Sequence, residues 1–110
     1  MQIKLPRWSL DDALEVIRSL QYKALQCGYH LALGGGVINK GHSHNDLDIV
    51  VLPLDGHPQK DSVEFTQLMA RTLGANVLMP GEASIATGYV FSLNTADNRR
   101  IDFLFYARPR

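Results

Sequence analysis

The chain has 110 residues, a length suited to one domain with a single hydrophobic core. Hydrophobic residues make up 45% of it and charged residues 20%, as in folded globular proteins. No apolar stretch approaches the ~20 residues that cross a bilayer. Eleven basic and eleven acidic residues cancel, which argues against long nucleic acids as partners, because phosphate binding draws on clustered Lys and Arg.

The first residues lack the apolar segment of a secretory signal, so the expected location is the cytoplasm. We therefore expect residues 1–110 to form a single domain in the cytoplasm, without a membrane partner. The lone Cys27 has no disulfide partner within the chain and is expected to be a small core residue.

The first predicted element is an amphipathic helix from residue 10 to about residue 26. Ser9 is suited to cap it, and Gly28 comes where a helix end favours a positive φ. Apolar residues recur at three- and four-residue intervals: Leu10, Ala13, Leu14, Ile17, Leu20 and Ala24. The alternating residues 29–33 then predict a strand that leads into three glycines.

A polar, turn-rich loop is expected over residues 39–45, followed by a buried strand over residues 47–52 that Pro53 ends. Asp61 can cap a second helix, which Gly74 would close. The inward face of that helix is predicted to be Phe65, Leu68, Met69, Thr72 and Leu73.

Three further strands are predicted, over residues 75–79, 85–93 and 100–106. Residues 96–98 should form a hairpin turn between the last two strands, which would pair antiparallel. This order of elements predicts an α/β protein of the α+β type, with a mixed sheet and its helices packed on one face.

Two carboxylates open the buried strand. Asp46 and Asp48 should point to the same side of it, about 6.6 Å apart along the strand. Asp102 interrupts an otherwise apolar strand, where an unpaired carboxylate would cost several kcal/mol, so we expect a partner, a metal or an exposed position. If the two strands are neighbours, the three acids meet. Mg²⁺, or Mn²⁺ in its place, suits such a set because it takes hard oxygen ligands and completes its shell with substrate phosphates.

Gly34, Gly35 and Gly36 follow the first strand, and their bare backbone could approach phosphate oxygens closely. The run is neither a Walker A motif nor a dinucleotide fingerprint. A tight turn between strands is the alternative interpretation of the glycines, and a solvated strand end is the alternative for the Asp-x-Asp pair. The ordered set of strand, glycine turn, polar loop and acids favours a nucleotide site.

The run Gly34-Gly35-Gly36-Val37, then Gly41, then His44-Asn45-Asp46-Leu47-Asp48-Ile49 resembles the signature of the nucleotidyltransferase superfamily. That superfamily includes DNA polymerase beta, the CCA-adding enzymes and the MNT-type minimal nucleotidyltransferases. The His-x-Asp-Leu-Asp form is most similar to the lincosamide and aminoglycoside nucleotidyltransferases.

The resemblance implies transfer of a nucleoside monophosphate from a nucleoside triphosphate, such as ATP, to a hydroxyl acceptor. It implies that Asp46, Asp48 and Asp102 are catalytic and bind the metal ions, and that Gly34, Gly35 and Gly36 contact the triphosphate. His44 could contact the nucleotide, although a loop histidine such as His42 or His44 can also simply be solvated.

The acceptor stays open: a small molecule, a protein or an RNA end. Relatives that modify antibiotics or tRNA carry further elements, so a homodimer or a partner protein could complete the acceptor site here. The alternative function is a catalytically inactive binding or regulatory module with the same fold, such as an antitoxin or an inhibitor.

Overall fold

The computed structural model describes residues 8–35, 42–43, 46–78, 83–84 and 88–106. Its helices are α1 (Leu10–Gln26) and α3 (Ser62–Leu73). Its strands are β1 (Trp8–Ser9), β2 (Tyr29–Gly34), β3 (His42–Ser43), β4 (Leu47–Pro53), β5 (Asn76–Val77), β6 (Ala83–Ser84), β7 (Gly88–Asn94) and β8 (Arg100–Tyr106).

Helix α1 confirms the predicted cap and bounds. The Ser9 hydroxyl accepts a hydrogen bond from the Asp12 backbone N–H at 3.1 Å, and this satisfies one of the unpaired donors of the first turn. The chain leaves the helix through Gly28, whose φ is +85°. Cys27 is buried as expected, and burial raises the pKa of its thiol.

Helix α3 begins at the predicted cap, where the Asp61 carboxylate accepts from two backbone N–H groups, and it ends at Gly74 with φ +66°. Its buried face is centred differently from the prediction. The fully buried residues are Phe65, Thr66, Met69 and Ala70. Thr72 is only half-buried and donates its hydroxyl to the carbonyl of Leu68, a bond within its own helix.

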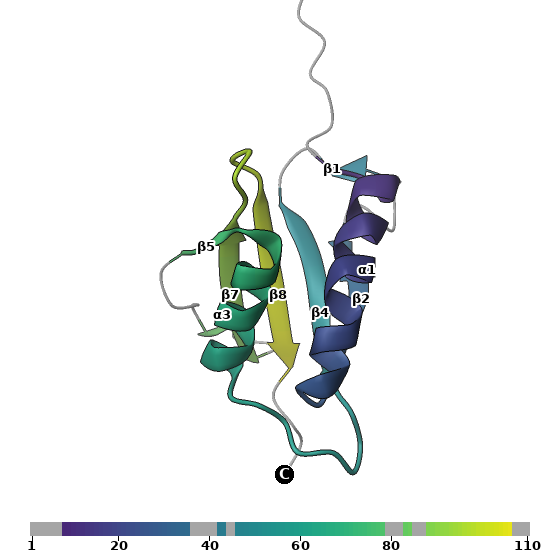
Figure 1. The fold of residues 1–110 in the computed structure, drawn as a ribbon. Helices are drawn as coiled ribbons and strands as arrows, with labels where there is room; N and C mark the ends of the chain where they lie inside the picture. The colour runs from purple at the N-terminus through teal and green to yellow at the C-terminus, as the bar shows by residue number, and fades with distance from the viewer. Residues whose placement is uncertain (1–7, 36–41, 44–45, 79–82, 85–87, 107–110) are drawn as a thin grey trace, which may run out of the picture.

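The main sheet has the strand order β2-β4-β8-β7-β5, with β6 paired to β7. Strands β4 and β8 run parallel, whereas the other described pairs are antiparallel. The sheet is therefore mixed, as predicted. Both helices cover one face of it: α1 packs on β2, α3 packs near β5 and β7, and the helices contact each other (Figure 1). The α+β fold class is thus confirmed.

Between the helices and the sheet, edge-to-face aromatic pairs fill the core. The ring of Phe65 on α3 lies 5.0 Å from Tyr29, 5.5 Å from Phe105 and 6.0 Å from Phe103, centroid to centroid. Such pairs contribute about 0.5–1.5 kcal/mol each beyond the area they bury. In the described part of the chain, no helix has the length and apolar character needed to cross a membrane.

Strands β3, β5 and β7 differ from the prediction in their presence or their bounds. The strand expected over residues 75–79 comprises only Asn76–Val77, both exposed, and residue 79 lies outside the described residues. Strand β7 starts at Gly88, and residues 85–87 of its predicted range are also outside them. The predicted polar loop contains β3, which pairs antiparallel with β1. Strands β1, β3 and β5 have two residues each, which is too short for a period-2 signal in the sequence.

Candidate functional site

The acidic residues gather where β4 and β8 begin. These strands are parallel neighbours, and Asp48 is paired in register with Asp102. Because adjacent strands lie about 4.8 Å apart and paired residues face the same side, the two carboxylates project from one face of the sheet. Asp46 stands one residue before β4 and is about one-third exposed, at 38% for its side chain. The structure thus brings the three predicted acids to one edge of the sheet.

Asp102 is buried, yet its charge is satisfied. The Ser92 hydroxyl on the neighbouring strand β7 donates to Oδ1 at 2.6 Å, and Nε of Arg100 donates to the same oxygen at 2.8 Å. Charge-assisted bonds of this kind offset the cost of burying a carboxylate. They also fix the orientation of the Asp102 side chain.

Arg100 joins two of the acids. Its Nε also lies 3.5 Å from Oδ2 of Asp46, and its terminal guanidinium nitrogen donates to the Ser92 hydroxyl at 3.0 Å. The alternation of strand β8 already places Arg100 on the same face as Asp102, because residues two apart on a strand share a face.

The surroundings of Asp48 disfavour the charged form of its carboxyl group. Burial raises the pKa of this carboxyl, and the neighbouring Asp102 and Asp46 raise it further, while Arg100 lowers it. Arg100 is the smallest of these influences, so burial and like charge dominate the surroundings of this carboxyl.

The glycine turn lies directly against Asp48. Gly34 pairs with Asp48 across the β2–β4 ladder. The next residue, Gly35, has φ +65°, and a Cβ added there would stand 2.5 Å from Oδ2 of Asp48. Only a residue without a side chain allows this approach of backbone to carboxylate.

Two of the predicted nucleotide contacts, Gly36 and His44, lie outside the described residues. Within the described part of the chain, no three His, Cys, Asp or Glu side chains are arranged to hold a metal ion jointly. Metal binding by Asp46, Asp48 and Asp102 stays a prediction. In this structure the guanidinium of Arg100 contacts two of these carboxylates.

The fold is similar to that of a cytoplasmic RNA terminal U-transferase, with a TM-score of 0.53 and 15% sequence identity over 89% of this chain and 30% of that one. The chain has a nucleotidyltransferase-type fold. A ternary complex of polymerase beta from Leishmania infantum also aligns, with a TM-score of 0.46 and 17% identity over 94% of this chain and 43% of that one. The chain therefore spans less than half the length of either protein. No protein-family model matches the sequence, and no curated protein does.

Proposed function

We propose that this chain is a metal-dependent nucleotidyltransferase that moves a nucleoside monophosphate from a nucleoside triphosphate to a hydroxyl acceptor and releases pyrophosphate. The observation that carries the proposal is the pairing of Asp48 with Asp102 on parallel strands, with Asp46 beside them. The nucleotidyltransferase-type fold supports the same general kind of reaction.

The donor chemistry of the carboxylates suits a divalent cation of the magnesium type, and the three described side chains would have to draw together to hold it jointly. They offer hard oxygen ligands, and their mutual repulsion raises the pKa of Asp48, which a cation would relieve. We assign Asp46, Asp48 and Asp102 as the ligands of Mg²⁺, or of Mn²⁺ in its place. When bound, such an ion neutralises phosphate charge and stabilises the attacking and leaving oxygens.

The remaining chemistry is positioning. Ser92 and Arg100 hold Asp102 through one oxygen, which supports our assignment of Asp102 as the group that would receive the proton of the acceptor hydroxyl. Gly34 and Gly35, with Gly36 after them, would present backbone N–H groups to the β- and γ-phosphates. His44 would contact the nucleotide. Positioning and charge compensation carry most of phosphoryl-transfer catalysis.

For the acceptor we propose only a chemical class, a molecule with a free hydroxyl group. The aligned U-transferase acts on RNA termini, so an RNA end is the first acceptor to test, followed by small molecules and proteins. The likeness to lincosamide and aminoglycoside nucleotidyltransferases belongs to this proposal as well, as does the cytoplasmic location. A second copy of the chain or a partner protein would complete the acceptor site.

A regulatory module without turnover is the second candidate, and the contacts of Arg100 favour it. The guanidinium ties Asp46 to Asp102, so the acids are partly compensated by the chain itself. A module of this kind would bind a nucleotide or a partner without releasing pyrophosphate.

Calorimetry with each of the four nucleoside triphosphates, with and without Mg²⁺, tests the proposal, followed by transfer of α-labelled phosphate to an RNA oligonucleotide. We expect metal-dependent binding that Asp48→Asn abolishes and Asp55→Asn leaves intact, because Asp55 lies exposed in the turn after β4. Metal-independent binding without pyrophosphate release would identify the regulatory module. A fully active Asp48→Asn protein would exclude the mechanism.

A further inference from the structure

Trp8 lies where three segments of the chain meet. Its backbone pairs with Ser43 through the β1–β3 ladder. Its indole N–H donates to the backbone carbonyl of Arg100 at 3.1 Å, across 92 positions of sequence. The side chain is 1% exposed, and its ring carries the guanidinium of Arg99 at 4.0 Å from the centroid.

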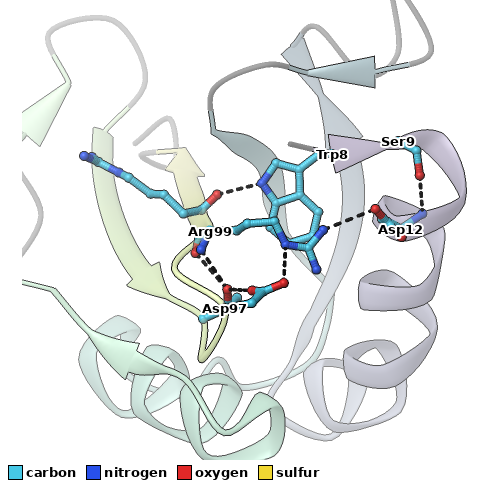
Figure 2. A network of polar contacts seen from close by, with 7 residues as sticks. Trp8, Ser9, Asp12, Asp97 and Arg99 are labelled. Atoms are coloured by element: carbon cyan, nitrogen blue, oxygen red, sulfur yellow. Dashed lines mark hydrogen bonds and ion pairs between the residues drawn. The ribbon is translucent and has the colours of Figure 1, made fainter. Parts of the chain in front are cut away.

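Arg99 is fixed on that ring from two sides (Figure 2). Its guanidinium pairs with Asp97 in the hairpin turn at 2.8 Å and with Asp12 in the first turn of α1 at 3.2 Å. Its backbone N–H donates to the Thr95 hydroxyl at 3.0 Å. The guanidinium cannot leave the ring without giving up both ion pairs, so the side chains of Trp8 and Arg99 act as one unit that joins the start of α1 to the β7–β8 hairpin.

This unit reaches the candidate site through Arg100. The β4–β8 ladder begins at Leu47 and Ile101, so it fixes Asp48 and Asp102 but not Asp46. Asp46 contacts the guanidinium of Arg100, and the backbone carbonyl of Arg100 accepts from the indole N–H of Trp8.

We propose that Trp8 and Arg99 are positioning residues, which hold Arg100 and, through it, Asp46 in place relative to Asp102. The catalytic consequence rests on the function proposed above, whereas the structural consequence does not. A partner outside the ligand set that orients metal-binding side chains is worth about 10–100-fold in metal affinity or activity where this has been measured.

The first measurement follows the Nε–H proton of Arg100 by nuclear magnetic resonance, without metal or nucleotide. In the native protein this proton is bonded to Asp102. We expect Arg99→Met and Trp8→Phe to move its signal toward that of a solvated arginine and to speed its exchange. Trp8→Phe is the sharper variant, because it keeps a ring for Arg99 and removes the indole N–H.

The second measurement is the affinity for Mn²⁺ alone, by electron paramagnetic resonance. Arg99→Met and Trp8→Phe should each weaken binding about 10-fold or more, and Arg99→Lys should recover part of the loss because it keeps a cation on the ring. Arg71→Met, on the exposed side of α3, is the matched control for a lost charge. Phe65→Leu is the control for a destabilised core, since Phe65 is fully buried away from this unit.

The outcomes separate the two proposals. If Arg99→Met and Trp8→Phe are destabilised like Phe65→Leu while the Arg100 signal and Mn²⁺ affinity stay native, the residues are merely structural and the inference is overturned. If the native protein does not bind Mn²⁺, the proposed function fails instead. The Arg100 signal then decides the positioning role by itself.

Discussion

Gly35→Ala tests the contact between the glycine turn and the acids most directly. Gly35 has φ +65°, and its new Cβ would stand 2.5 Å from Oδ2 of Asp48, well inside van der Waals contact. The oxygen is the far end of a side chain, so we expect the Asp48 carboxylate to rotate away rather than the backbone to shift. The substitution should therefore displace the functional group while leaving the fold intact.

Its cost in stability can be separated from its effect on the site. An alanine in the left-handed region costs about 1–2 kcal/mol. Gly74 provides the matched control because it has φ +66° and nothing within 4 Å of an added Cβ. Gly35→Ala and Gly74→Ala should lose similar free energies of unfolding, about 1–2 kcal/mol each. Only the first should alter Asp48.

The assay combines urea unfolding with the carboxyl resonance of Asp48 and the affinity for Mn²⁺. Burial is the largest cause of the raised pKa of Asp48, and the charges of Asp102 and Asp46 raise it further. Rotation of the Asp48 carboxylate changes its distance from both of these charges. We expect a changed titration and at least about 10-fold weaker Mn²⁺ binding in Gly35→Ala, with native values in Gly74→Ala. Identical titrations and affinities in the two variants would refute the close approach of Gly35 to the acid.

Three further predictions concern the same charges and one tight turn. Burial and like charges raise the pKa of Asp48, so its contribution to stability is present below its unfolded-state value of 3.8 and is lost as pH rises through the folded-state pKa. Asp48→Asn should therefore stabilise the protein by about 0.5–2 kcal/mol at pH 7, and urea unfolding should show the gain shrinking in acid. Arg100→Gln should raise the pKa of Asp48 further in a carbon-13 titration, whereas Arg71→Gln should not. Gly28→Ala should cost about 3 kcal/mol in thermal or urea unfolding, since its Cβ would stand 2.1 Å from the carbonyl oxygen of Pro58; a loss below about 1 kcal/mol would contradict that contact.

The helices could be predicted because their signals are local. Ser9 and Asp61 cap helices where their side chains reach the first backbone N–H groups, and Gly28 and Gly74 take the positive φ that ends them. Each signal depends on residues within one turn of the chain. The strands β4 and β8 were equally accessible, because apolar residues run along both of them, and alternate residues of β4, Leu47, Ile49 and Val51, are buried in the core.

Contacts between distant segments could not be derived in this way. Nothing in the sequence near Trp8 indicates that its indole N–H bonds a carbonyl 92 positions away. The β1–β3 pairing has the same character: two residues on each side carry no periodicity. Such contacts depend on the final topology, which a local pattern does not contain.

The acids are an intermediate case. The signal for Asp102 was the free-energy cost of burying a carboxylate rather than a local sequence pattern. A carboxylate in an apolar strand needs a compensating partner, and this argument, together with the resemblance to nucleotidyltransferases, directed attention to Asp102. Carried one step further, it required a donor on the same face, and strand alternation already placed Arg100 there. Once β4 is known to be the neighbour of β8, Asp48 and Asp102 are paired in register with Asp46 close by. This gathering of carboxylates from two strands, more than the Asp-x-Asp spacing, is the physical reason to test for a divalent cation where β4 and β8 begin.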